Sequence, residues 1–255
     1  MIIDIHAHNG TWTRSPGLPG ITAAYDYLGE TMPEFIADLD RDAVSHCLIS
    51  STTALVGDPI EGNIETYRAS DMDSRLFAYT YYHPMQIDVS LAEIEKYRFH
   101  PKFIGFKTRP EHHEITLDHP SYEPLLQAAA AMQRPILVHC MLMEDAYGIA
   151  ATARRFHAPL IMVHAGGARY EEAVGLVRDL EHVFIEPVTS MHHPGKIRKI
   201  LDIVGHERLM FGSDYGAMSR PRIMRTYEEA KLSDTEEEAI FRNNALQLFR
   251  LPAAG

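Results

Sequence analysis

Eight short apolar runs, separated by segments with helical spacing, constrain the fold of this chain more than any other feature. The runs are rich in Ile, Val, Leu, Phe and Met, which is typical of parallel strands covered on both faces. Strand alternating with helix predicts an α/β fold, here a (β/α)8 TIM barrel, which needs about 250 residues. One domain then spans residues 1–255. The predicted strands are 2–8, 45–51, 76–82, 103–107, 135–140, 160–166, 183–189 and 209–214.

The segments between the runs have helix signals of their own. Pro33 suits the first turn of a helix over 33–44, and Ser121 can cap a helix over 121–133. Further helices are expected over 144–156, 170–180, 195–204 and 233–251, and helical spacing is weaker over 59–73 and 88–97. A doubly wound open sheet would need a glycine turn after an early strand, where His-Ala-His stands instead.

Composition and charge limit the possible partners. The net charge of −11 argues against binding to nucleic acid or to an anionic membrane, whose phosphates need a basic surface. The N-terminus lacks a basic region before an apolar stretch, so no secretory signal is expected. Cys47 and Cys140 lie in apolar runs and are expected to be buried free thiols. A cytoplasmic protein that acts on a small molecule is therefore expected.

Ionisable residues close five of the apolar runs. The carboxyl ends of barrel strands meet at one end of the barrel, where active sites of such folds lie. Buried charged or imidazole groups cost free energy unless they are paired, hydrogen-bonded or bound to a metal. Packing alone does not explain so many of them at one end. These residues are His6, His8, Lys107, His139, His164 and Asp214.

The residue types at these strand ends favour metal chemistry. His6 and His8 are two residues apart in a predicted strand, so their side chains point the same way. Imidazole nitrogens and a carboxylate oxygen suit Zn²⁺, although Mn²⁺ or iron can occupy the same type of site. A metal lowers the pKa of bound water towards about 7. Asp214 could then touch the metal and accept the proton from that water.

Six motifs, spread over the chain in the expected order, resemble the amidohydrolase superfamily. They are IDIHAH, GFKTRP, PILVHC, IMVHAGG, LMFGSDYG and NALQLFRL. The resemblance is to the amidohydrolase 2 branch, which includes aminocarboxymuconate-semialdehyde decarboxylase, resorcylate-type decarboxylases and several lactonases. It implies a TIM-barrel metal enzyme in which His6, His8, His139 and Asp214 are metal ligands. His164 would be the catalytic histidine that polarises the substrate or shuttles a proton, with Asp214 as the second catalytic residue.

Lys107 has two roles among these relatives. In binuclear members the lysine of the fourth strand is carboxylated and bridges two metals. A second metal, bridged by a carboxylated Lys107, is therefore the alternative. One divalent metal is favoured here, with Lys107 as a substrate-binding cation. Arg109 and Arg14 follow predicted strands and could bind a substrate carboxylate. Trp12 and Tyr82 are candidates for the lining of the substrate pocket.

Glu186 and the segment 111–114 supply further acidic groups near the predicted strand ends. Glu186 lies inside the seventh run and is a candidate partner of Lys107 or Arg109. The segment 111–114, Glu-His-His-Glu, lacks the histidine spacing of a zinc-protease helix and is expected to be a surface loop.

Two reactions fit the expected ligand set. Hydrolysis of a small lactone or amide that carries a carboxylate is favoured, because the chain has no long insertion to build a larger pocket. Non-oxidative decarboxylation of an unsaturated or aromatic acid is the alternative, and it uses the same residues. A barrel that binds metal and ligand without catalysis is a lesser alternative, since it would not need both His164 and Asp214. A homo-oligomer, a dimer, is expected.

Overall fold

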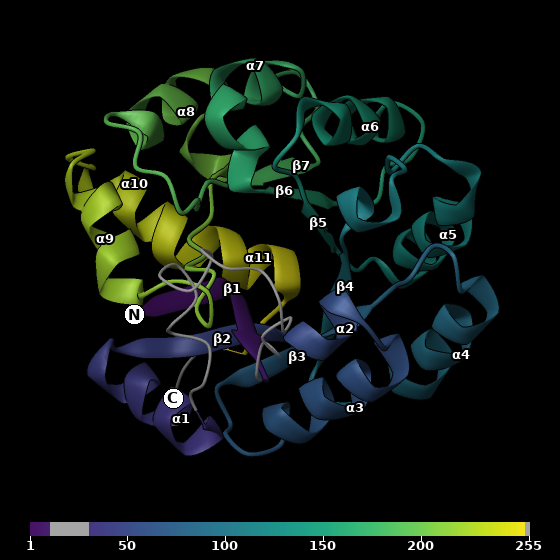
Figure 1. The fold of residues 1–255 in the computed structure, drawn as a ribbon. Coiled ribbons are helices and arrows are strands. Elements are labelled where there is room, and N and C mark those ends of the chain that lie inside the picture. The colour runs from purple at the N-terminus through teal and green to yellow at the C-terminus, as the bar shows by residue number, and fades with distance from the viewer. Residues whose placement is uncertain (11–30, 253–255) are drawn as a thin grey trace, which may run out of the picture.

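Seven parallel strands form the centre of the computed structural model, which describes residues 1–10 and 31–252. They follow one another in sheet order from β1 to β7, and helices surround them (Figure 1). The alternation of strand and helix predicted from the sequence is confirmed for these seven strands. Their bounds are β1 Ile2–Asn9, β2 Val44–Ser51, β3 Leu76–Tyr81, β4 Phe103–Thr108, β5 Ile136–His139, β6 Leu160–Val163 and β7 Val183–Glu186.

Each predicted helix has a counterpart among the described helices. Two short ones were not expected: α2 follows β2 directly, and α9 follows the last apolar run. The predicted C-terminal helix is divided by a π-helical turn over Ala239–Asn243. The helices are α1 Met32–Arg41, α2 Thr52–Val56, α3 Pro59–Ser70, α4 Ile87–Tyr97, α5 Glu123–Met132, α6 Met143–Ala153, α7 Tyr170–Gly175, α8 Lys196–Val204, α9 Arg220–Glu228, α10 Asp234–Glu238 and α11 Asn244–Phe249.

The eighth apolar run lies between β7 and β1 but is not a regular strand. The amide of Met210 donates to the carbonyl of Ile185 at 3.0 Å, and the amide of Ile5 donates to the carbonyl of Phe211 at 3.1 Å. Asp214 has φ = 53°, which no strand residue adopts, and it interrupts the ladder. The prediction of an eight-stranded barrel is therefore confirmed for seven strands, with an irregular segment at the eighth position.

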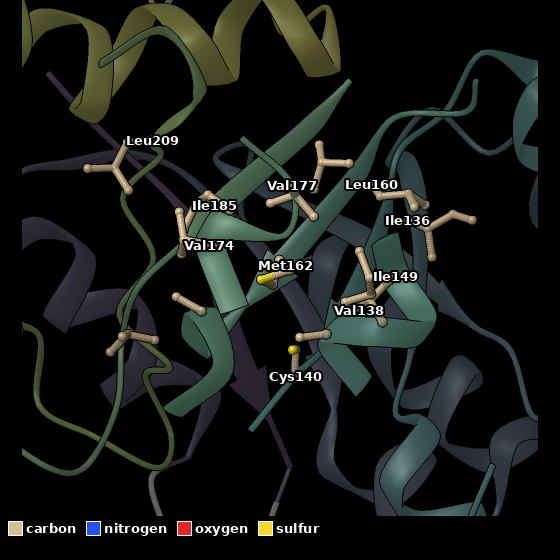
Figure 2. Close-up of a cluster of buried hydrophobic side chains, with 14 of the residues drawn as sticks. Ile136, Val138, Cys140, Ile149, Leu160, Met162, Val174, Val177, Ile185 and Leu209 are labelled. Atoms are coloured by element: carbon tan, nitrogen blue, oxygen red, sulfur yellow. The ribbon is translucent and has the colours of Figure 1, made fainter. Parts of the chain in front are cut away.

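Side chains of the strands form two apolar layers. The inner layer includes Ile3, Ile5 and Tyr79, and Phe249 of α11 packs into it with its ring 6.1 Å from that of Tyr79. The outer layer packs against the surrounding helices and is shown in part in Figure 2. Because apolar residues fill the inner layer, polar side chains have room only at the strand ends beyond it.

An irregularity in β1 changes which residues face inward. Asp4 pairs with Cys47 of β2, but Ala7 pairs with Ile49, so β1 has one extra residue in between. Such a bulge re-aims the side chains that follow it. Ile5 belongs to the inner layer and Ala7 to an outer cluster, so the bulge leaves His6 on the inner side.

Two smaller expectations concern the cysteines and membrane insertion. Cys47 and Cys140 are free and buried, as predicted. Among the described residues, no helix has the length and apolar character needed to cross a membrane.

Candidate metal centre

Three of the four predicted metal ligands converge at the carboxyl end of β1. The Nε2 atoms of His6 and His8 lie 3.1 Å apart. Asp214 Oδ1 lies 3.5 Å from the first and 3.1 Å from the second. All three residues are buried, and their ligand atoms are close enough together to hold one ion.

Each imidazole of the centre has its other nitrogen engaged by an outer acceptor. An acceptor at Nδ1 holds the ring proton there and leaves the Nε2 lone pair facing the centre. The arrangement predicts neutral imidazoles with their free lone pairs turned inward. The contacts are His6 Nδ1 to Glu186 Oε2 at 3.2 Å, His8 Nδ1 to the Ser50 carbonyl at 3.0 Å, and His164 Nδ1 to the Val188 carbonyl at 2.6 Å.

These contacts fit a divalent metal. Two lone pairs 3.1 Å apart repel each other unless a cation or a proton lies near both. Burial, together with the charge of Lys107, lowers the pKa of His6 well below its ordinary value, so protonation is disfavoured. Two imidazole nitrogens and a carboxylate oxygen are a donor set that first-row divalent metals accept. The described residues therefore suit such a metal.

Asp214 is held in place by its backbone. Its amide donates to the carbonyl of His6 at 2.7 Å, and its φ of 53° is uncommon for a residue other than glycine. Burial raises the pKa of its carboxyl, but contact with His8 and the charge of Lys107 outweigh this, and the net shift is downward. Asp214 is thus a carboxylate at neutral pH.

Lys107 lies inside the same cluster. Its Nζ is 3.4 Å from His6 Nε2, and the side chain is buried. Burial lowers the pKa of Lys107 to about 8, with the charge of Asp214 opposing that shift. The structure thus brings Lys107 to the site, as the sequence predicted, as a cation at neutral pH.

The other two histidines predicted for the site, His139 and His164, form a pair beside the group of His6, His8 and Asp214. His164 Nε2 lies 3.2 Å from His139 Nδ1, and the rings of His6 and His164 are 5.3 Å apart. His139 thus lies beside His164, but it is in neither of the two groups of described residues whose ligand atoms are close enough together to hold one ion. Its assignment as a ligand stays a prediction.

Glu111 is a site residue that the sequence analysis missed. Its Oε1 lies 3.0 Å from His139 Nε2, and it accepts hydrogen bonds from Arg109 Nε at 2.9 Å and Nη2 at 2.6 Å. The expectation that 111–114 is a surface loop is therefore wrong for Glu111, whose side chain is only 16% exposed. Its place just after β4 could have indicated that it reaches the site.

Glu186 is also placed differently from the expectation. It contacts neither Arg109 nor Lys107 by hydrogen bond in the described structure. Its Oε2 lies against His6 Nδ1, and its Oε1 accepts from the amide of Val188 at 2.8 Å. Glu186 therefore orients His6, a predicted metal ligand.

The predicted lining of the substrate pocket is not confirmed at Tyr82. Its hydroxyl donates to the carbonyl of Ser121 at 2.7 Å, and its ring packs in the outer apolar layer. Side chains alternate along β3, so Tyr81, one residue earlier, faces the other way from Tyr82. Trp12 and Arg14 lie outside the described residues.

A buried ion pair fixes the segment that carries Asp214. Asp4 accepts from Arg220 Nε at 2.8 Å, and also from the amide and hydroxyl of Ser213 at 3.0 and 2.6 Å. Arg220 is 1% exposed and Asp4 is not exposed. The pair joins β1 to the start of α9 and positions the residue next to Asp214. The sequence analysis did not identify it.

Comparison with known protein families agrees with the resemblance seen in the sequence motifs. The family model described as amidohydrolase matches residues 67–251. The chain belongs to the amidohydrolase family. No curated protein gives a significant match to this member of the family.

Solved structures resemble this amidohydrolase over nearly their whole length. A 5-carboxyvanillate decarboxylase from Sphingomonas paucimobilis has a TM-score of 0.75 at 15% identity, covering 98% of this chain and 99% of its own. An amidohydrolase from Burkholderia multivorans has a TM-score of 0.74 at 18% identity, covering 99% and 100%. A dihydroxybenzoic acid decarboxylase from Polaromonas sp. JS666, with bound manganese and the inhibitor 2-nitroresorcinol, has a TM-score of 0.68 at 14% identity, covering 87% and 86%.

These comparisons correct the functional expectation. At such identities the likeness shows the fold alone. The similar structures are nevertheless mostly decarboxylases, of 5-carboxyvanillate and of dihydroxybenzoate. The hydrolase favoured from the compact size of the chain is therefore contradicted, and the decarboxylase alternative is the better supported one. The small size of the chain was a poor guide to the type of reaction, because the alignment with this chain covers 99% of a similar decarboxylase.

Proposed function

We propose that this amidohydrolase is a metal-dependent, non-oxidative decarboxylase of an aromatic or unsaturated carboxylic acid. The observation that carries the proposal is the burial of Lys107 against the ligand group, with its Nζ 3.4 Å from His6 Nε2. A buried ammonium group beside a metal site needs a negative partner. The decarboxylases among the similar structures support the same reaction.

Charge balance favours an anionic substrate. A divalent metal and Lys107 together carry more positive charge than the nearby carboxyl groups of Asp214 and Glu186 neutralise. Arg109 adds little to this excess, because Glu111 pairs with it. A substrate carboxylate between the metal and Lys107 would complete the balance in a site with little access to water.

The ligand group favours one divalent metal, and Mn²⁺ is the proposed ion. His6, His8 and Asp214, with His139 as the candidate fourth ligand, would hold it. The Polaromonas decarboxylase, which is similar in fold, carries manganese, whereas nothing specific favours Zn²⁺. When bound, the metal supplies a Lewis acid for the substrate carboxylate and a neighbouring oxygen. The irregular segment 209–215 takes the place of an eighth strand and would present Asp214 to a bound ion.

The proton that replaces the carboxylate is assigned to Asp214. Because Asp214 is ionised, it can first accept the proton of a substrate hydroxyl and then deliver it to the ring carbon. The bond from that carbon to the carboxylate breaks, the carbon is left with the new hydrogen, and carbon dioxide departs. His164 holds its proton at Nδ1 against Val188 and offers only an acceptor at Nε2. It is suited to orient the hydroxyl.

The test is decarboxylation in deuterated water. Manganese-loaded protein would be incubated with hydroxybenzoates that carry an ortho or para hydroxyl, and the products would be followed by proton NMR. We expect carbon dioxide release and one deuterium at the vacated carbon. Asp214→Asn should keep its fold and lose turnover. Cleavage of lactones or amides by the same protein, with no release of carbon dioxide from any acid, would contradict the proposal.

A further inference from the structure

We infer that Lys196, the first residue of α8, is a positioning residue that fixes the orientation of His164 through the main chain at the ends of β6 and β7. This role rests on the proposed function for what His164 does to the substrate, but it does not depend on which acid is decarboxylated. The sequence analysis predicted a helix over 195–204 and gave Lys196 no role.

The backbone that carries His164 is held in an unusual conformation. His164 and Ala165 have φ of 66° and 53°, and the two glycines that follow them also have positive φ. Left-handed backbone is unfavourable for residues that have a Cβ, and it persists only where surrounding contacts fix it. One such contact is the amide of Gly166, which donates to the carbonyl of Cys140 at 2.9 Å. The segment at His164 needs further contacts of this kind.

Lys196 supplies two of the contacts at this point. Its Nζ donates to the carbonyl of Pro187 at 2.6 Å and to the carbonyl of His164 at 3.4 Å. The lysine is only 6% exposed, so its ammonium group depends on protein acceptors in place of water. An ammonium has three N–H donors and can serve both carbonyls at once. Lys196 therefore joins the end of β6 to the end of β7.

The end of β7 in turn holds the imidazole of His164. The carbonyl of Val188 directly follows that of Pro187 and accepts from His164 Nδ1 at 2.6 Å. The amide of Val188 donates to Glu186 Oε1 at 2.8 Å, and Glu186 Oε2 accepts from the amide of His164 at 3.4 Å. Lys196 is thus bonded both to the main chain of His164 and to the residue before its ring acceptor. Its loss should free the imidazole to turn.

Helix α8 supplies a matched control. Lys199 lies three residues after Lys196, is 51% exposed and pairs with Glu171 Oε1 at 2.7 Å. Lys196→Met removes the donors and keeps an unbranched side chain, and Lys199→Met makes the same change away from His164. Lys196→Arg restores charged donors, and a cavity of about 30 Å³ beside Lys196 leaves room for the larger guanidinium.

The first measurement is the exchange rate of the ring N–H proton of His164 with water. It uses metal-free, full-length protein labelled with ¹⁵N-histidine, with the signal assigned by its loss in His164→Gln. A proton held in a buried hydrogen bond exchanges slowly, because exchange requires local opening. We expect exchange about 2- to 10-fold faster in Lys196→Met, the effect of weakening one hydrogen bond. Lys199→Met and Lys196→Arg should exchange at nearly the wild-type rate.

An unchanged rate in Lys196→Met would overturn the inference, since Lys196 would then stabilise the fold without orienting the ring. Should Lys196→Met not fold, Lys196→Gln takes its place. Its shorter, neutral side chain is a weaker donor to both carbonyls, so the same faster exchange is expected. A wild-type rate in Lys196→Gln would likewise contradict the role.

The second measurement is turnover of the acid. Because Lys196 acts through His164, Lys196→Met should lower kcat, by up to about 100-fold for a misplaced group, with a smaller effect on KM. Lys196→Arg should recover much of the loss. A rise in KM with kcat unchanged would make Lys196 a substrate ligand and overturn its assignment. Absence of decarboxylation by the wild type would contradict the proposed function and leave the exchange measurement valid.

Discussion

The Nε2 atoms of His6 and His8 lie 3.1 Å apart, although each imidazole turns its Nδ1 to an acceptor of its own. Adjacent lone pairs in a buried site are unfavourable without a cation. The pair is therefore better explained by metal binding than by packing, and the outer acceptors, Glu186 and the Ser50 carbonyl, set its orientation.

His8→Ala should abolish stoichiometric metal binding, because it removes one of the converging nitrogens. The measurement is metal content per chain after loading with Mn²⁺ and desalting, by elemental mass spectrometry. His157→Ala, at an exposed position, should bind as the wild type does. Equal metal content in the wild type and in His8→Ala would place the metal elsewhere.

Gly212→Ala should disturb the centre through sterics alone. A Cβ at this position would lie 2.6 Å from Glu186 Cγ and 2.8 Å from His6 Cβ, closer than carbon atoms approach. We expect a loss of about 1–3 kcal/mol in the free energy of unfolding, measured with urea, together with weaker Mn²⁺ binding.

The control for this substitution is Gly175→Ala in α7, where an added Cβ meets no atom within 4 Å. Alanine is favoured over glycine in a helix by up to about 1 kcal/mol, so this variant should be as stable as the wild type or more so. Similar losses in both variants would argue against a steric origin at Gly212.

Asp4→Asn and Arg220→Met should each destabilise the fold strongly. Removing one partner of a buried ion pair costs about 3–5 kcal/mol, because the other charge is left without compensation. Both side chains are almost fully buried. The double variant should cost less than the sum of the two single variants in urea unfolding.

An exposed ion pair gives the comparison for Arg220. Arg41 pairs with Asp38 and Asp42, and its side chain is 53% exposed. Arg41→Met should change the free energy of unfolding by about 0–1 kcal/mol. Comparable losses for Arg41→Met and Arg220→Met would show that burial does not distinguish these pairs.

Asp145→Asn should change how stability depends on pH. Burial, with the nearby charge of Glu111, raises the pKa of Asp145 to about 7, and its Oδ2 has no hydrogen-bond partner among the described residues. The folded state thus binds this proton more tightly than the unfolded state, so the carboxyl reduces stability as pH rises from about 4 to 7. Asparagine removes that loss.

The expected result is a gain in the free energy of unfolding at pH 8, on the order of 1 kcal/mol or more, with little change near pH 4. Urea unfolding at both pH values measures it. Glu144→Gln, an exposed neighbour in the same helical turn, should show no such difference. A gain that is equal at both pH values would have another cause.

Local pattern predicted much of the fold and part of the site. Continuous apolar runs predicted eight parallel strands, of which seven are regular in the described structure. The ionisable residues that close these runs include His6, His8, Lys107 and Asp214, and the structure brings these four side chains together. This succeeds because the carboxyl ends of parallel strands share one end of the sheet. The identity of the residue at a strand end is enough to place it there.

Contacts that join distant parts of the chain were not predictable in the same way. Glu186 was assigned to a cation but supports His6, 180 positions away in the sequence. Tyr82 was placed one residue out of phase with the inward face of β3. Glu111 follows a strand in an irregular turn, and no periodic pattern shows where such a side chain points.

The sequence by itself determined the alternation of strands and helices and the residue types that meet at the carboxyl ends of the strands, because both depend on short-range period and chain order. The tertiary structure alone decided which atoms of those residues face the centre. Ile3 and Ile5 face inward, so strict alternation would send His6 and His8 outward. The bulge between Asp4 and Ala7 reverses this. Its extra residue follows from the pairing of β1 with β2, which the residues of β1 do not specify.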